Sequence, residues 1–152
     1  TKRGVAGGKH WFSEYGIELS RNFKSLKAWI SIKEHGINKY SRQIQKNIHQ
    51  ANYLSQRINA SPELEQLSPT SLNIVCFRYI AKTLNNDQLN ELNREILLQL
   101  HESGIAVPTY ATLDDKYALR VSITNHRTLR TDLDLFVNEV LKLGHKLTQN
   151  SD

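Results

Sequence analysis

Residues 117–124 read Tyr-Ala-Leu-Arg-Val-Ser-Ile-Thr, and this stretch decides the class of fold. Apolar and polar side chains alternate along it, with Leu119, Val121 and Ile123 between Arg120, Ser122 and Thr124. Successive side chains of a β-strand point to opposite faces, so this spacing predicts a strand in a sheet with one apolar face. The apolar face must be covered by another layer of structure.

Three other stretches are predicted to join this strand. Residues 73–80 are rich in β-branched and aromatic side chains and are bounded by polar turns, which is typical of a strand. Residues 65–68 and 105–110 show weaker strand patterns. Cys76 falls inside the apolar run of 73–80, so we expect a small buried hydrophobe and not a reactive thiol.

The first half of the chain is predicted to hold two helices. The first begins near Ser20 and ends at Gly36, a residue that can adopt the left-handed conformation that closes helices; we expect it to be short and largely buried. The second has apolar residues at spacings of three and four, namely Ile37, Tyr40, Ile44, Ile48, Ala51, Leu54 and Ile58. Its opposite, solvated face is expected to carry Arg42, Gln45, Lys46, Gln50 and Gln56.

Two more helices complete the pattern. Asn85, Asn86 and Asp87 are candidate caps for a helix that Gly104 closes. A last helix is expected to begin near Asn125 or Thr128. The predicted order is ααββαββα, an α+β fold with a small antiparallel sheet covered by helices on one face and preceded by a helical arm.

The composition is that of an ordinary globular domain, with 152 residues, 39% hydrophobic and 23% charged. The net charge of +5 comes from Lys and Arg scattered along the chain, so we favour a solvated surface over a nucleic-acid interface. One cysteine excludes an internal disulfide, and no signal segment or long apolar run is present. We expect a cytoplasmic protein that does not bind membranes. The chain begins at Thr1 and lacks methionine, so we also expect a longer parent.

Common catalytic and metal motifs are missing. Lys9 follows Gly7 and Gly8 but is followed by His10, so the phosphate-loop pattern fails. The six histidines include no pair at positions i and i+4 of one helix, which argues against a zinc site. No Gly-x-Ser-x-Gly elbow occurs.

Residues 11–29, Trp-Phe-Ser-Glu-Tyr-Gly-Ile-Glu-Leu-Ser-Arg-Asn-Phe-Lys-Ser-Leu-Lys-Ala-Trp, closely resemble a segment of the pyridoxal-phosphate-dependent group II amino-acid decarboxylases. That family includes the aromatic amino acid, glutamate and diaminobutyrate decarboxylases. The resemblance continues through residues 33–36, 74–79 and 119–125. It implies that residues 1–24 are a connecting segment from a large domain outside this sequence. Residues 25–152 would then be the C-terminal small domain of a fold-type I enzyme.

The resemblance also implies a function. The full-length protein would be a carboxy-lyase that uses pyridoxal 5'-phosphate, acts on a small amino-acid substrate and forms a homodimer. The family holds the cofactor in the large domain, and its Schiff-base lysine is preceded by histidine. Lys9 precedes its histidine, so no catalytic lysine is assigned to this chain. We expect the chain alone to be inactive and to complete and cover the active site within its parent.

Arg120 is the main candidate for substrate binding. A guanidinium offers a planar fork of donors that matches a carboxylate. The resemblance implies that this arginine lies at the active-site mouth and helps to hold the substrate carboxylate; the alternative is a structural ion pair with a neighbouring Asp or Glu, such as Asp114 or Asp115. Arg21 matches a second family arginine, which braces the substrate or the domain junction, with a structural salt bridge as the equal alternative.

Two non-catalytic functions remain open from the sequence. Phe77, Arg78 and Tyr79 loosely resemble a base-stacking strand of an RNA-binding module, although the glycine-bearing aromatic signature of such modules is absent. A stand-alone dimerisation module is the other, since Trp11 and its aromatic neighbours Phe12 and Tyr15 would be exposed without a large domain. Within a complete enzyme we favour packing over a substrate channel for these aromatic residues.

Overall fold

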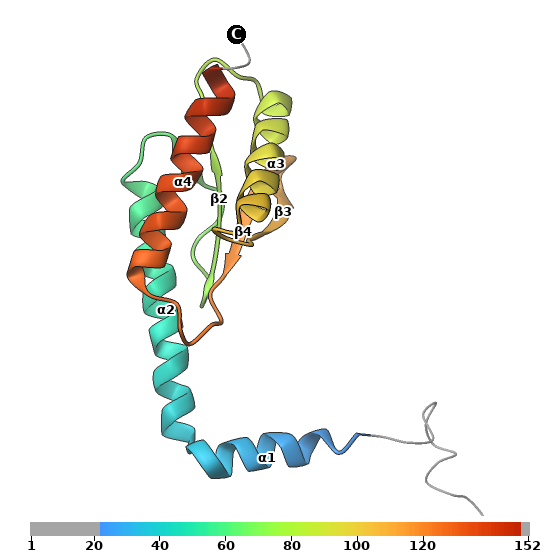
Figure 1. Ribbon diagram of the computed structural model, residues 1–152, viewed down its shortest axis with the longest axis vertical. Coiled ribbons are helices and arrows are strands. Elements are labelled where there is room, and N and C mark those ends of the chain that lie inside the picture. The colour runs from blue at the N-terminus through green and yellow to red at the C-terminus, as the bar shows by residue number, and fades with distance from the viewer. Residues whose placement is uncertain (1–21, 150–152) are drawn as a thin grey trace, which may run out of the picture. The chain divides into compact units, whose positions relative to one another are not determined.

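The computed structural model of the chain describes residues 22–149 (Figure 1). The chain divides into two compact units, one up to Tyr40 and one from Ser41 onward. The elements are α1 (Lys24–His35), α2 (Ile37–Asn59), β1 (Leu64–Gln66), β2 (Ile74–Tyr79), α3 (Asn86–Ser103), β3 (Thr109–Leu113), β4 (Lys116–Ser122) and α4 (Arg130–Gln149). This order confirms the predicted ααββαββα.

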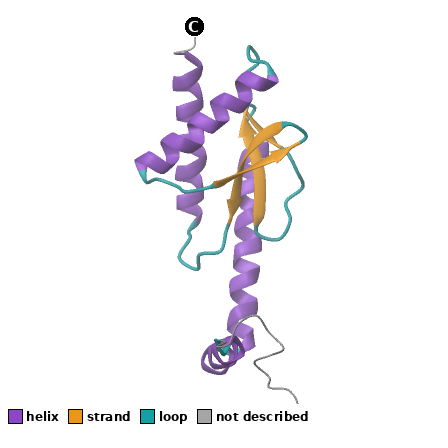
Figure 2. Cartoon of the chain, turned by 90° about the vertical axis from the view of Figure 1, so that its right-hand side faces the viewer, coloured by secondary structure: helices purple, strands orange, loops and turns teal. Residues whose placement is uncertain are grey.

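The four strands form one antiparallel sheet in the order β1-β2-β4-β3 (Figure 2). In its register Phe77 pairs with Leu119, Cys76 pairs with Arg120, and Arg120 also pairs with Thr109 on β3. Because side chains alternate along a strand, Phe77 and Leu119 share one face while Cys76 and Arg120 share the other. The alternation predicted for residues 117–124 therefore exists and spans two neighbouring strands.

The core lies between the sheet and the helices. Val75, Phe77 and Leu119 are fully buried there against residues of α2, α3 and α4, among them Leu54, Ile58, Ile96, Val137 and Val140. The rings of Phe77 and Phe136 meet edge to face with centroids 5.9 Å apart, a favourable aromatic geometry. Phe77 and Tyr79 are buried. They therefore cannot form the exposed surface on which RNA bases would stack if β2 bound RNA.

Local signals in the sequence explain several boundaries. Asn85 caps α3: its side chain accepts a hydrogen bond from the Gln88 amide, and the Gln88 side chain accepts one from the Asn85 amide. Gly104 ends the same helix with a φ of 70°, in the left-handed region that glycine tolerates. Asp114 and Asp115, also with positive φ, form the two-residue turn between β3 and β4. Cys76 is buried and free, as expected.

Two predicted boundaries were wrong. The strand expected over residues 105–110 is instead β3, at Thr109–Leu113, because Pro108 has no N–H to donate to a ladder. The last helix begins at Arg130, later than Asn125 or Thr128. The Asn125 side chain accepts a hydrogen bond from the Arg127 amide, which holds a turn there and delays the helix.

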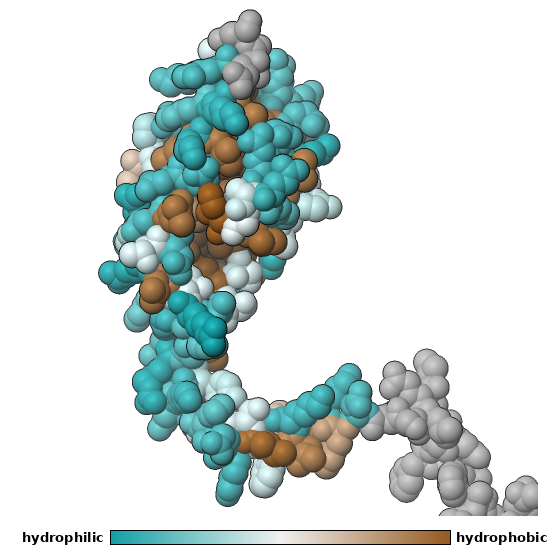
Figure 3. All heavy atoms as spheres, in the orientation of Figure 1, coloured by the Kyte–Doolittle hydropathy of each residue, from teal (hydrophilic) through white to brown (hydrophobic). Residues whose placement is uncertain are grey.

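The expected burial of the first two helices was also wrong in part. No residue of α1 is buried, and the Trp29 side chain is 60% exposed. Figure 3 shows hydrophobic side chains at the surface of α1. A helical apolar stripe is buried only where another layer covers it, and the described part of the first unit, up to Tyr40, offers no such layer.

The stripe of α2 is likewise buried only in part. Ile37 and Ile44 are exposed, whereas Ala51, Leu54 and Ile58 are fully buried. Gln50, expected on the solvated face, is buried. Among residues 22–149, none of the helices combines the length and the apolar character that a membrane span needs.

Candidate functional site

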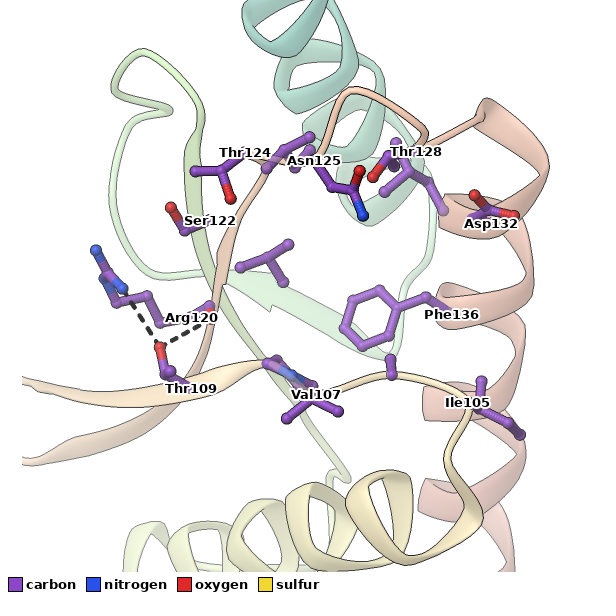
Figure 4. Close-up of a pocket in the computed structure, with 15 residues that line it drawn as sticks. Ile105, Val107, Thr109, Arg120, Ser122, Thr124, Asn125, Thr128, Asp132 and Phe136 are labelled. Carbon is purple, nitrogen blue, oxygen red and sulfur yellow. Dashed lines mark hydrogen bonds between the residues drawn. The ribbon is translucent and has the colours of Figure 1, made fainter. Parts of the chain in front are cut away.

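A pocket of about 310 Å³ lies where the end of β4, the connection from α3 to β3 and the start of α4 meet (Figure 4). One side of its lining is apolar and includes Ile105, Val107 and Phe136. The other side is polar and is formed by residues that follow β4, among them Thr124 and Asn125. The strand-to-helix connection therefore places amide and hydroxyl groups opposite an apolar wall.

Arg120 lies at the edge of this pocket. Its backbone belongs to β4, and its guanidinium points away from Phe136 toward the face of the sheet opposite the core (Figure 4). Arg120 Nη1 donates a long hydrogen bond of 3.3 Å to Thr109 Oγ1, and Thr109 Oγ1 donates one of the same length to the Arg120 carbonyl. The side chain is only partly buried, so its remaining donors are available to a ligand.

The predicted alternative for Arg120, an ion pair with Asp114 or Asp115, is not formed. Both aspartates occupy the turn that joins β3 to β4. At about 3.3 Å per residue, the five positions from Asp115 to Arg120 correspond to roughly 16 Å along the strand, beyond the reach of the side chains. Within residues 22–149, no carboxylate forms an ion pair with Arg120.

Arg78 lies on the same face of the sheet as Arg120, but Glu65 neutralises its charge. It is only 6% exposed, its Nε lies 2.7 Å from Glu65 Oε2, and its Nη1 donates to Asn86 Oδ1 at 2.8 Å. Lys116 Nζ lies 2.9 Å from the other Glu65 oxygen. Burial alone raises the pKa of the Glu65 carboxyl, but the hydrogen bonds and charges of Lys116 and Arg78 outweigh burial and hold that pKa below its ordinary value.

Sequence reasoning missed this network and also missed Thr109 as the neighbour of Arg120. The sequence pattern predicts that Arg78 and Arg120 lie in strands, but it does not show which of the two arginines forms an ion pair with a carboxylate. Glu65 and Lys116 lie 51 residues apart in the sequence, and only the strand order β1-β2-β4 brings them together. Arg21 and the aromatic residues Trp11, Phe12 and Tyr15 lie outside the described residues.

The pocket residues do not form a cofactor site for pyridoxal phosphate. Such a site needs a lysine for the covalent bond and groups that hold the phosphate and the ring nitrogen. No lysine lines the pocket, and its ionisable residues are Arg120 and Asp132. Asp132 Oδ2 already accepts a hydrogen bond from the Leu129 amide, which caps α4. This pocket therefore does not supply the lysine or the phosphate-binding groups that the cofactor needs.

Comparison with known proteins gives a consistent result. Residues 7–80 match the pyridoxal-dependent decarboxylase conserved domain. The chain is 30% identical over 138 residues to an aromatic-L-amino-acid decarboxylase of Bacillus atrophaeus, covering 90% of this chain and 29% of that protein. It is 28% identical to tryptophan decarboxylase 2 of Oryza sativa subsp. japonica, again over 90% of this chain and 28% of the relative.

Solved structures agree with the sequence matches. The Oryza sativa TDC structure with PLP and tryptamine shares the fold with a TM-score of 0.80 at 18% identity, over 90% of this chain and 29% of that chain. The glutamate decarboxylase domain of a Vibrio parahaemolyticus protein aligns with a TM-score of 0.74 at 25% identity, over 83% of this chain and 27% of that chain. The chain spans less than a third of each of these proteins. In sequence and in fold, the chain is therefore similar to the pyridoxal-dependent decarboxylases.

Proposed function

We propose that this chain is the C-terminal part of a pyridoxal-phosphate-dependent amino-acid decarboxylase and that Arg120 binds the carboxylate of the amino-acid substrate. The proposal rests on one observation: Arg120 presents a guanidinium on the face of the sheet opposite the core, and none of the described carboxylates pairs with it. A guanidinium and a carboxylate form two parallel charge-assisted hydrogen bonds, and a long bond to a neutral hydroxyl is easily exchanged for them.

The neighbours of Arg120 support this role. Thr109 contacts the guanidinium without neutralising it, so it orients the side chain and leaves its charge available. Arg78 and Lys116 are both satisfied by Glu65 and do not compete for an anionic ligand. In this proposal the cofactor, the catalytic lysine and most of the substrate pocket belong to the rest of the parent protein.

The substrate is proposed as a class, a small α-amino acid. The two relatives matched by sequence, from Bacillus atrophaeus and Oryza sativa, are decarboxylases of aromatic amino acids, which favours an aromatic side chain for the substrate of the parent protein. The chain alone is proposed to be inactive. Formation of amine from amino acid and added pyridoxal phosphate by the purified 152-residue chain would contradict that.

The substrate role is tested in the full-length protein that contains this chain by replacing Arg120 with methionine. Two competitive inhibitors are compared, an amino-acid analogue with a carboxylate and the corresponding amine without one. Loss of charge-assisted hydrogen bonds costs about 1.5–3 kcal/mol, so the analogue is expected to bind about 10–100-fold more weakly while the amine is unaffected. Equal weakening of both inhibitors would contradict carboxylate binding. Arg94→Met is the matched control, since Arg94 is exposed on α3.

We further propose that the full-length protein is a homodimer in the cytoplasm, as its family resemblance implies. The exposed apolar side chains of α1, Trp29 and Ile30 among them, are suited to be covered by the rest of the parent protein or by a second subunit. Sedimentation analysis of the full-length protein tests the homodimer, and a mass that stays at one chain across the concentration range would contradict it.

A further inference from the structure

A second pocket, of about 400 Å³, lies between α2 and the segment that leads into α4. Eight residues line it, and four of these carry basic side chains: Arg42, Lys46, His49 and Arg130. The three on α2 are four and three residues apart, a spacing that places them on one face of the helix. In the sequence these charges look scattered over a solvated surface, but the fold gathers them around one cavity.

The charge of this pocket is not compensated. In the part of the chain from residue 22 to 149, neither Arg42, Lys46 nor Arg130 forms an ion pair with a carboxylate. Lys46 Nζ donates to the His126 carbonyl at 2.8 Å, and the Arg130 guanidinium lies 5.1 Å from the centre of the Tyr53 ring. These contacts fix two cations without neutralising them. Like charges four residues apart destabilise a helix, so Arg42 and Lys46 impose a cost unless an anion binds there.

Gln50 adds a second, independent observation. It lines the same pocket and is only 5% exposed. Its Nε2 donates to the Thr128 carbonyl, but its Oε1 is buried and accepts no hydrogen bond from any described residue. A buried acceptor without a donor costs about 1–3 kcal/mol, and such groups in native proteins call for an explanation such as a bound ligand. A ligand for this pocket therefore needs a hydrogen-bond donor as well as negative charge.

We propose that this pocket binds a phosphate group that carries a proton, either as hydrogen phosphate or as the monoanion of a small phosphate monoester. Its negative charge is neutralised by Arg42, Lys46 and Arg130, and its P–OH donates to Gln50 Oε1. The pocket also borders the N-terminus of α4, where the helix dipole favours an anion. Asp132 in the first turn of α4 is engaged by the Leu129 amide and lines the other pocket. This site goes beyond the proposed role in decarboxylation and does not depend on it.

The phosphate site predicts a preference that simple electrostatic attraction does not. Sulfate has the size and charge of hydrogen phosphate but carries no proton at neutral pH, so it cannot donate to Gln50 Oε1 and leaves that acceptor unsatisfied. One lost hydrogen bond to a charged partner corresponds to about a tenfold difference in affinity. We expect phosphate to bind at least about tenfold more tightly than sulfate at equal ionic strength.

The test is a titration of the 152-residue chain followed by amide resonances in ¹H–¹⁵N spectra. Inorganic phosphate, glycerol phosphate and sulfate are the three ligands, at constant ionic strength. Shifts are expected at residues 42–50 and 128–130. Tighter binding of glycerol phosphate than of phosphate would identify a monoester as the ligand, and the reverse order would identify free phosphate. Absence of shifts there, or an equal response to sulfate, would overturn the proposal.

Three variants complete the test. Arg42→Gln and Lys46→Gln are expected to weaken phosphate binding by at least about tenfold each, because each removes one cation from the pocket. Gln50→Met is expected to abolish the preference for phosphate over sulfate. Lys82→Gln is the control, since Lys82 is exposed and lies outside the pocket. Arg42 and Lys46 are not fully buried, so both positions are expected to tolerate glutamine. An unchanged affinity for phosphate in both of these variants would also overturn the proposal.

Discussion

The ring of Tyr79 in β2 occupies the space that a Cβ atom at Gly144 in α4 would need. Both residues are buried, and this close approach lets the C-terminal half of α4 lie directly on the sheet. Glycine normally weakens a helix interior by about 1 kcal/mol relative to alanine. Here the absence of a side chain is required by the packing of helix against strand.

Gly144→Ala is therefore expected to destabilise the protein although it raises helix propensity. An inserted methyl group in a packed core costs about 1–3 kcal/mol, which exceeds the gain in propensity. Chemical denaturation of the 152-residue chain measures the change. Asn138→Ala, at an exposed position of the same helix, is the control and is expected to be neutral or stabilising. A Gly144→Ala variant as stable as the parent chain would show that Tyr79 moves aside without cost.

Asn93 makes a second contact that fixes Tyr79. Its Oδ1 accepts from the Tyr79 amide at 2.7 Å, and its Nδ2 donates to the carbonyls of Tyr79 and Leu89 at 2.8 Å each. Asn93 is fully buried, so its loss leaves backbone groups of β2 without partners.

Asn93→Ala is expected to lower the free energy of unfolding by about 2–4 kcal/mol, from two unsatisfied backbone groups. Asn93→Asp keeps the acceptor and removes the donor, so it is expected to be destabilising at neutral pH as well. Asn90→Ala is a useful comparison, since Asn90 makes similar bonds to Tyr117 and Asp115 nearer the surface. If Asn93→Ala costs no more than Asn90→Ala, burial does not decide the strength of these contacts.

Glu65 makes the stability of the sheet depend on pH. Its pKa in the folded protein lies below the ordinary value of 4.5, so the ionised carboxylate stabilises the fold above the unfolded pKa. That stabilisation is lost as the pH falls through the folded pKa. Glu65→Gln is expected to cost about 2 kcal/mol at neutral pH, because Arg78 stays buried with only Asn86 as partner. The difference between the two proteins should shrink below pH 4.5, and a difference that is constant with pH would contradict the assignment.

Sequence patterns predicted the order of all eight elements. Apolar periodicity indicated the helices and β4, whereas β-branched and aromatic composition indicated β2. These patterns predicted β3 wrongly because Ile105 and Val107 look like strand residues, while Pro108 prevents them from pairing. They also predicted a buried α1, since an apolar stripe indicates that a helix is covered but does not say by what.

The candidate site was predicted only in part. Arg120 was found through strand alternation and family resemblance, whereas its neighbour Thr109 depends on the register of β3. The basic pocket around Gln50 was missed because its cations come from α2 and from the start of α4, some eighty residues apart. Local patterns do not report such long-range pairs.

Arg78 and Arg120 allow structural and functional roles to be separated with one matched pair of variants. Arg78→Met removes a buried cation from Glu65 and Asn86, so it is expected to lower the free energy of unfolding by about 2 kcal/mol. Arg120→Met removes a partly exposed side chain whose one side-chain hydrogen bond among the described residues is a 3.3 Å bond to the Thr109 hydroxyl. Its effect on unfolding is expected to be within about 0.5 kcal/mol.

The same two variants in the full-length protein should show the opposite order for ligand binding. Arg120→Met is expected to weaken a carboxylate-bearing inhibitor, while Arg78→Met leaves its affinity unchanged at temperatures where the protein is folded. Denaturation curves and inhibition constants for the two variants together check both expectations. If Arg120→Met proves as destabilising as Arg78→Met, its guanidinium serves the fold, and the strand position of Arg120 no longer argues for substrate binding.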